Sequence, residues 1–119
     1  MMKSFIFQKD NLVSLPREEA ERILNKYSDR VPVVVTLAKT NNDAPLLDKN
    51  KYLVPRDLTV GQFQYVIRKR LRLPPEKALF LFVKNCVPPT SQLIETIYEE
   101  NKSDNLFLYI TYSLENVFG

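Results

Sequence analysis

The chain ends on a glycine, Gly119, and this residue is the strongest candidate for chemistry in the sequence. Only two glycines occur among the 119 residues, so a terminal glycine is not a simple consequence of composition. Because glycine has no Cβ beside its carboxylate, the carboxylate can enter a narrow tunnel of an enzyme. That enzyme could then adenylate the carboxylate and pass it to a thiol. The alternative is that Gly119 is an inert chain end.

The sequence lacks the residues of the common nucleophilic and metal-dependent catalytic sites. It contains no histidine and a single cysteine, Cys86, so a catalytic Cys–His pair is excluded. The same counts exclude an internal disulfide and the usual metal-ligand spacings. They also favour a reducing intracellular environment. We therefore interpret Cys86 as a small apolar filler and expect no enzyme activity, no metal and no cofactor.

Basic residues are the second group that could bind a partner. The chain carries 17 Lys and Arg against 14 Asp and Glu, a net charge of +3, which is too weak to name a polyanionic partner. Arg68-Lys69-Arg70 and Arg72 form a basic run, and such runs are usually solvated helix faces. Nucleic-acid binding is the alternative, but tryptophan and basic strands interleaved with aromatics are absent from the sequence. We therefore expect no nucleic-acid partner.

A single domain must position these residues, because a chain of 119 residues can bury one core without metal or disulfide support. No apolar run in the sequence approaches the length of a membrane span. Residues 14–27 should form a helix, with Ser14 as its cap and Pro16 in its first turn. Thr59-Val60-Gly61-Gln62 has the pattern of a capping box and predicts a second helix over residues 60–71.

Strand patterns separate these helices. Residues 31–37 form a β-branched run, and Pro32 should lie at the strand's start because proline cannot donate to a ladder. The remaining predicted elements are strands over 51–54, 79–83 and 106–112 and a short helix over 92–100. This order predicts an α+β domain with helices on one face of a small mixed sheet. A β-grasp topology with an added N-terminal helical region fits it.

The predicted sheet should place a binding edge at residues 51–54. Residues 31–37 and 106–112 should be neighbouring central strands, because each is apolar on at least one whole face. Along 51–54, alternation sends Lys51 and Leu53 to one face and Tyr52 and Val54 to the other. An edge strand can accept an extended peptide, with pockets for alternate side chains. From the residues alone, the apolar side chains here are interpreted as core.

Several ordered segments resemble the ubiquitin-like autophagy modifiers, relatives of the GABA-receptor-associated protein and of the microtubule-associated light chains. The resemblance spans about residues 17–119, with a small length difference in the loop at 39–47. It implies a single ubiquitin-like domain over 1–119, divided into an N-terminal helical region (1–28), a β-grasp core (29–112) and a flexible conjugation tail (113–119). The segments that carry it are Asp29-Arg30-Val31-Pro32-Val33-Val34-Val35, Lys51-Tyr52-Leu53-Val54-Pro55, Asp57-Leu58-Thr59-Val60-Gly61-Gln62-Phe63, Ile67-Arg68-Lys69-Arg70, Pro88-Pro89-Thr90-Ser91 and Phe107-Leu108-Tyr109-Ile110.

The resemblance implies a function for Gly119. In the family, separate activating and conjugating enzymes join the terminal glycine to phosphatidylethanolamine on autophagosomal membranes. A cysteine protease removes residues beyond the glycine and reverses conjugation. The protein would then be cytoplasmic when free and on the autophagosome membrane when lipidated. The alternative is a ubiquitin-like interaction module that is not conjugated, with Gly119 incidental.

The resemblance also implies a docking site for cargo receptors and adaptors. Their motifs have an aromatic anchor, two spacer residues and an aliphatic anchor. The implied aromatic pocket consists of Glu19, Ile23, Pro32, Val34, Lys51, Leu53 and Phe107. The implied aliphatic pocket consists of Tyr52, Val54, Pro55, Leu58, Phe63, Val66 and Ile67. Arg70, Lys51 and Arg30 are expected to meet acidic residues that flank the motif.

Overall fold

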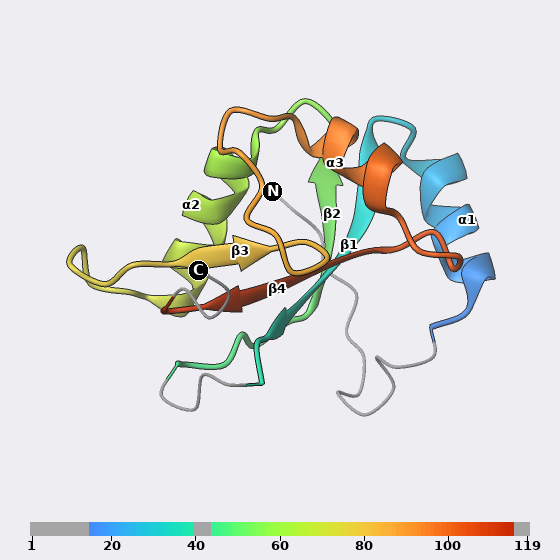
Figure 1. The fold of residues 1–119 in the computed structure, drawn as a ribbon. Coiled ribbons are helices and arrows are strands. Elements are labelled where there is room, and N and C mark those ends of the chain that lie inside the picture. Colours follow the sequence, from blue (N-terminus) through green and yellow to red (C-terminus); the bar gives the residue numbers. More distant parts are fainter. Residues whose placement is uncertain (1–14, 40–43, 116–119) are drawn as a thin grey trace.

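The computed structural model describes residues 15–39 and 44–115. Its elements follow the predicted order of helix, two strands, helix, strand, short helix and strand (Figure 1). Every predicted element is present, with ends that shift by up to three residues. The elements are α1 (Arg17–Lys26), β1 (Arg30–Leu37), β2 (Lys51–Pro55), α2 (Val60–Leu71), β3 (Phe80–Phe82), α3 (Ile94–Asn101) and β4 (Leu108–Ser113).

The four strands form one mixed sheet in the order β2-β1-β4-β3. The central pair, β1 and β4, is parallel, with Val33 opposite Leu108, whereas the two outer pairs are antiparallel. The predicted central position of β1 and β4 and the edge position of β2 are therefore confirmed. Pro32 lies near the start of β1, before the register with β4 begins, so its missing N–H interrupts no bond of that ladder.

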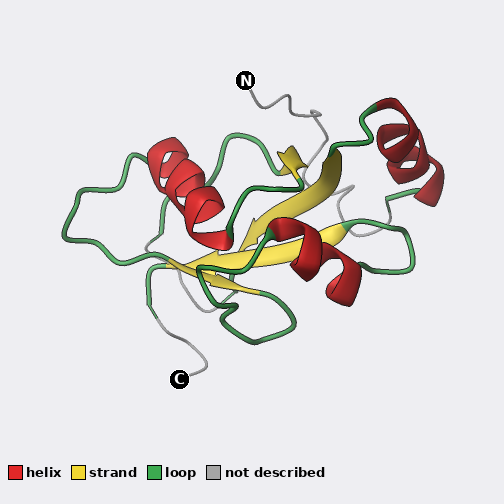
Figure 2. Ribbon diagram, turned by 90° about the horizontal axis from the view of Figure 1, so that it is seen from above, coloured by secondary structure: helices red, strands yellow, loops and turns green. Residues whose placement is uncertain are grey.

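The helices lie on both faces of the sheet, so the prediction that they share one face is wrong. Val33 and Val35 of β1 pack in the large core with residues of α2 and α3. Val34 points to the opposite face, where it packs with Ala20 of α1 and with Phe107. In Figure 2 α1 stands apart from the other two helices. The physical reason is the unbroken apolar run of β1, which needs cover on both sides.

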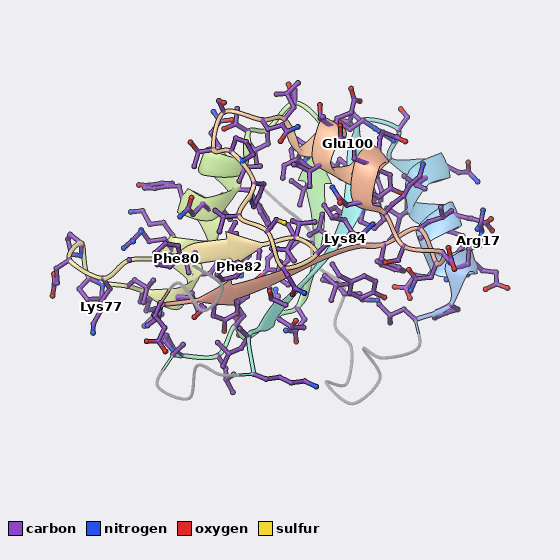
Figure 3. The ribbon with its side chains drawn as sticks, viewed as in Figure 1. Arg17, Lys77, Phe80, Phe82, Lys84 and Glu100 are labelled. Atoms are coloured by element: carbon purple, nitrogen blue, oxygen red, sulfur yellow. The ribbon has the colours of Figure 1, made fainter. Side chains whose placement is uncertain are left out.

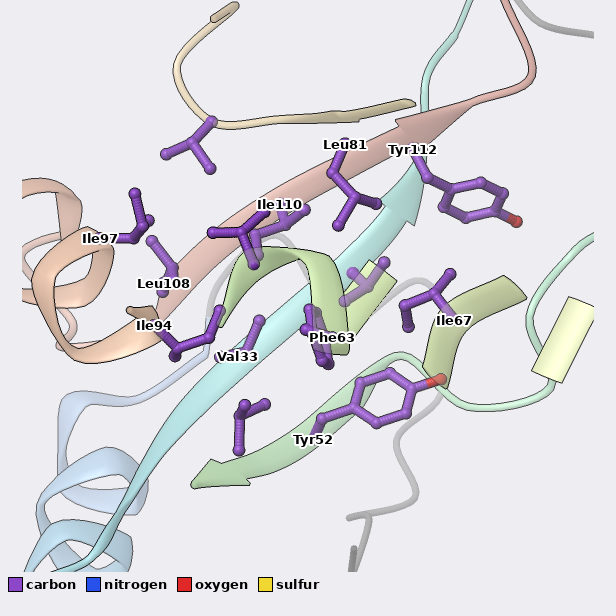
Figure 4. Packing of buried hydrophobic residues seen from close by; sticks show 14 of the residues in the cluster. Val33, Tyr52, Phe63, Ile67, Leu81, Ile94, Ile97, Leu108, Ile110 and Tyr112 are labelled. Atoms are coloured by element: carbon purple, nitrogen blue, oxygen red, sulfur yellow. The ribbon is translucent and has the colours of Figure 1, made fainter. Parts of the chain in front are cut away.

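The large core joins the sheet to α2 and α3, as the labelled side chains in Figure 4 show. Tyr52 and Phe63 meet edge to face, with ring centroids 6.0 Å apart. The buried tyrosines keep their hydroxyls bonded: Tyr52 donates to the Lys49 carbonyl at 2.8 Å, and Tyr112 donates to the Pro45 carbonyl at 2.7 Å. These bonds tie the loop before β2 to the core.

The predicted capping box of α2 is confirmed. The Gln62 backbone N–H donates to the Thr59 hydroxyl oxygen at 3.1 Å, and the Thr59 backbone N–H donates to the Gln62 side-chain oxygen at 2.9 Å. At its other end, α2 stops at Arg72, whose left-handed backbone (φ 56°) closes the helix. Helix α1 begins later than predicted, with Pro16 as an N-cap that makes no side-chain bond. Ser14, the predicted cap, lies outside the described residues.

Cys86 is exposed, so its interpretation as a small apolar filler is wrong. It closes a tight turn after β3, in which Lys84 and Asn85 both have positive φ and Val83 pairs with Cys86. The turn places Cys86 at the surface because β3 ends at Phe82, one residue earlier than predicted. Among residues 15–39 and 44–115, no helix is both long and apolar enough to cross a membrane.

Candidate functional site: the β2 edge and its two faces

Strand β2 lies at an edge, with β1 as its neighbouring strand in the sheet. The Val35 N–H donates to the Asn50 carbonyl at 2.8 Å, which sets the antiparallel register. In that register the peptide groups of Lys51 and Leu53 point away from β1, because outward and inward groups alternate along an antiparallel pair. The Arg30 guanidinium donates to the Leu53 carbonyl at 3.4 Å on this outer side.

The seven residues of the implied aromatic pocket come together on the α1 face of the sheet. Pro32 pairs with Leu53 and Val34 pairs with Lys51 across β1 and β2. All seven side chains are buried, so this pocket is closed in the structure. The seven are Glu19, Ile23, Pro32, Val34, Lys51, Leu53 and Phe107.

A buried ion pair lies in the middle of this group. The Lys51 ammonium bonds to the Glu19 carboxylate of α1 and lies 5.9 Å from the centroid of the Phe107 ring. Only 1% of Lys51 is exposed. Burial lowers the pKa of Lys51 to about 8, although the Glu19 hydrogen bond and charge oppose the shift. Lys51 therefore faces an internal carboxylate, so an external acidic residue would have to compete with Glu19 for it.

The implied aliphatic pocket lies on the opposite face of β2, toward α2. Four of its residues are core side chains, namely Tyr52, Val54, Phe63 and Ile67. The other three, Pro55, Leu58 and Val66, are half-buried and form its accessible rim. The deeper residues of this set are thus part of the core, and the open surface is smaller than the residue set alone indicates.

The rim continues into a cleft of about 570 Å³ that the sequence reasoning missed. Leu58 and Val66 line it together with Tyr65, which is 58% exposed, and with Thr90. The approach of the two walls depends on Gly61, whose backbone N–H donates to the Thr90 carbonyl at 2.9 Å. A Cβ at Gly61 would lie 3.3 Å from that oxygen. The sequence feature that could have indicated this cleft is Gly61, an unexpected glycine in the first turn of a helix.

The expected basic residues lie at separate places around β2. Arg70 ion-pairs with Asp48 at 3.8 Å, and its guanidinium lies 5.5 Å from the centroid of the Tyr52 ring. Arg70 therefore borders the α2 face, whereas Lys51 belongs to the α1 face. Arg30 lies at the outer side of the strand, bonded to Leu53. Acidic groups flanking a bound peptide could meet Arg70 and Arg30 without disturbing the buried pair.

Two other predictions concern Gly119 and metal binding. Gly119 lies outside them, so its role stays a prediction. Within residues 15–39 and 44–115, no group of three or more His, Cys, Asp or Glu could hold a metal ion.

Comparison with known proteins identifies a family for this chain. Residues 16–119 match the family model described as "Autophagy protein Atg8 ubiquitin like". The chain is 58% identical to Autophagy-related protein 8B of Oryza sativa subsp. indica over 113 residues, covering 95% of this chain and 94% of that protein. It is 55% identical to Autophagy-related protein 8e of Arabidopsis thaliana over 119 residues, covering 100% of this chain and 97% of that protein.

Solved structures agree with these sequence relatives. Trypanosoma brucei ATG8 superimposes with a TM-score of 0.81 at 36% identity, covering 91% of this chain and 95% of that one. Plasmodium falciparum Atg8 in complex with an Atg3 peptide from the same organism gives a TM-score of 0.76 at 33% identity. That match covers 83% of this chain and 87% of the Plasmodium chain.

Proposed function

Because the chain belongs to the Atg8 family of ubiquitin-like autophagy proteins, we propose that Gly119 is its point of conjugation and that β2 is its peptide-docking edge. As a member of this family, the chain is a ubiquitin-like modifier rather than an enzyme, as the sequence predicts. The observation that carries the docking proposal is the edge strand β2, which presents the two implied pockets on its opposite faces.

The proposed conjugation uses the carboxylate of Gly119. An activating enzyme joins the carboxylate to AMP from ATP and releases pyrophosphate. A cysteine thiol of that enzyme then displaces AMP to form a thioester, and a cysteine thiol of the conjugating enzyme takes over the acyl group and frees the first thiol. The amine of phosphatidylethanolamine attacks the carbonyl, an amide forms and the thiol leaves. The solved Plasmodium Atg8 complex with an Atg3 peptide supports a conjugating enzyme as a partner. A processing and deconjugating cysteine protease completes the proposed set.

Conjugation would place a domain without a membrane-spanning helix among its described residues on a bilayer. Two acyl chains give stable anchoring, since each buried CH₂ contributes about 0.8 kcal/mol. The free protein would be cytoplasmic and the lipidated form would lie on the autophagosome membrane.

Reconstitution with activating enzyme, conjugating enzyme, ATP and phosphatidylethanolamine liposomes tests the conjugation proposal. We expect Gly119→Ala to abolish or severely slow the liposome-bound product, because a Cβ crowds the reacting carbonyl. Asn116→Ala, a tail substitution that leaves this carbonyl unchanged, is the matched control and should react normally. Liposome-bound product from Gly119→Ala at the wild-type rate would instead support the non-conjugated interaction module.

The proposed docking mode adds an extended peptide to the outer side of β2. The aliphatic anchor would lie against Pro55, Leu58 and Val66, whose exposed parts form the open rim. The aromatic anchor would enter the α1 face beside Leu53, which requires side chains around the Glu19–Lys51 pair to move because that face is closed. Cargo receptors and adaptors with an aromatic-x-x-aliphatic motif are the proposed ligands.

The affinity of this site should be modest. Each anchor gains about 1.5–3 kcal/mol on burial, and association and ordering subtract several kcal/mol. The dissociation constant should therefore be on the order of micromolar.

Titration of a labelled motif peptide tests the two pockets separately. We expect Leu53→Ala to weaken binding through the aromatic pocket and Val66→Ala to weaken it through the aliphatic rim. Leu46→Ala is the matched control, because Leu46 is 63% exposed and lies outside both pockets. Leu53 is buried, so urea unfolding must show that its variant is folded, whereas Val66 is half-buried and gives the cleaner test. Dissociation constants equal to wild type for both pocket variants would reject this site.

A further inference from the structure

The C-terminal end of α2 and the loop after it carry a basic surface that peptide docking does not use. We call it the basic patch and define it by the exposed side chains of Lys69, Arg72 and Lys77. Within the described part of the chain, none of these three cations forms an ion pair. The Lys69 ammonium lies 5.3 Å from the centroid of the exposed Tyr65 ring, which leaves its charge at the surface.

Two neighbouring arginines have structural roles that hold the patch in place. The Arg68 guanidinium donates to the Pro74 carbonyl at 3.2 Å and also to the Lys77 carbonyl, so it fastens the loop to α2. Arg70 is paired with Asp48. The basic patch is therefore built on a bonded loop and a helix end rather than on a loose segment.

The basic patch adjoins the start of the tail. Arg72 and Lys77 line a cleft of about 410 Å³ together with Leu114 and Glu115, which follow the end of β4. Gly119 is four residues beyond Glu115. A chain of that length spans at most about 14 Å when fully extended. A membrane attached at Gly119 must therefore lie close to this end of the domain.

We propose that the basic patch contacts anionic phospholipid headgroups once the domain is anchored, and that this contact sets the orientation of the domain on the membrane. The inference rests on the proposed conjugation at Gly119. Each Lys or Arg close to an anionic surface favours contact by about fivefold, so three cations together give on the order of a hundredfold. Glu76, next to Lys77 in the sequence, and Glu115, which lines the same cleft, reduce this figure. The anchor keeps the domain at the surface, so a weak attraction is enough to orient it.

This orientation has a consequence for the docking edge. Lys77 lies at the end of the molecule opposite Arg17 and α1 (Figures 1 and 3). With the basic patch against the bilayer, α1 and the α1 face of β2 point away from it. The α1 side of the peptide site would then stay open to partners from the surrounding solution.

A chemically tethered protein tests the contact without the conjugating enzymes. Gly119→Cys, in a chain that also carries Cys86→Ser, is coupled to a maleimide derivative of phosphatidylethanolamine in vesicles. The chain has no tryptophan, so Ala78→Trp, next to Lys77 and exposed, supplies a unique fluorescent reporter. Quenching of this tryptophan by brominated phosphatidylcholine reports its approach to the bilayer. Vesicles are made with and without phosphatidylserine.

We expect quenching to increase severalfold with phosphatidylserine and to return to the neutral-vesicle level in high salt. The increase should be lost in a variant with Lys69→Gln, Arg72→Gln and Lys77→Gln. The matched control, with Arg22→Gln, Lys26→Gln and Lys84→Gln, removes the same charge elsewhere and should keep it. The proposal is overturned if quenching does not depend on phosphatidylserine. It is also overturned if quenching falls equally in both variants. Salt-sensitive binding of single-stranded RNA through the same three cations, without any effect of phosphatidylserine, overturns it as well. Because the tether bypasses the enzymes, these outcomes are independent of whether Gly119 is conjugated.

Discussion

The buried Lys51–Glu19 pair should make the stability of this protein depend on pH in the alkaline range. Burial lowers the pKa of Lys51 from 10.5 to about 8 in the folded protein. In the unfolded chain the pKa returns to its ordinary value, so between these two values the unfolded chain binds more protons than the folded one. The free energy of unfolding must therefore rise with pH through this window.

The size of the rise follows from the two pKa values. One fully released proton contributes about 1.4 kcal/mol per pH unit. Integration from about pH 7 to about pH 10 gives an increase in the unfolding free energy of about 2.5 kcal/mol. At higher pH the buried tyrosines act in the opposite direction. Burial raises the pKa of Tyr52 to about 12, so the unfolded chain loses that proton first and stability falls.

Urea unfolding followed by far-UV circular dichroism across this pH range measures the effect. The rise should be present in the wild type and absent in Lys51→Met. In Glu19→Gln it should shift to lower pH, because the lost carboxylate no longer opposes the lowering of the Lys51 pKa. A Lys51→Met protein that keeps the whole rise would refute the assignment to this lysine. A wild type whose stability is flat or falls between these pH values would refute the burial argument itself.

Three further substitutions test the elements that position the site. Thr59→Ala removes the capping box of α2 and should lower the unfolding free energy by about 1 kcal/mol in urea titrations. An unchanged unfolding free energy would show that the box contributes nothing to stability. Phe63→Ala leaves a cavity beneath the aliphatic pocket and should lower the unfolding free energy by about 3–5 kcal/mol in the same titrations. A decrease of less than about 1 kcal/mol would contradict the place of Phe63 in the core. Asp48→Asn breaks an exposed pair with Arg70 and should change stability by less than about 0.5 kcal/mol. The same variant should strengthen binding of acidic-flanked peptides at low salt, and unchanged affinity would argue that Arg70 does not meet them.

The fold was predictable where a local pattern has a single structural reading. The Thr59 and Gln62 pair specified the start of α2, and the apolar runs specified which strands are central. The position of α1 was not predictable in the same way. Its apolar stripe shows that one face is buried, but the stripe does not say which side of the sheet covers it. The unbroken burial of β1 held that information, because both of its faces needed cover.

The two faces of β2 were predictable from the sequence, but the closure of the α1 face was not. Alternation along β2 placed Lys51 and Leu53 opposite Tyr52 and Val54, as the structure shows. The closure of the α1 face depends on a pairing between Lys51 and Glu19, which are far apart in sequence. No local pattern encodes a long-range ion pair. The cleft bounded by Tyr65 and Thr90 was missed for the same reason, since its two walls meet only in the folded chain.

The parallel pairing of β1 and β4 also constrains how the protein is made. The centre of the sheet joins a strand near the start of the chain to the last strand, with Val33 opposite Leu108. During synthesis, the edge of β1 that pairs with β4 must therefore wait unpaired until β4 has left the ribosome. Contacts that close so long a loop also form slowly. A nascent chain of this protein should depend on chaperones until its final strand emerges, after which the sheet can close around β1.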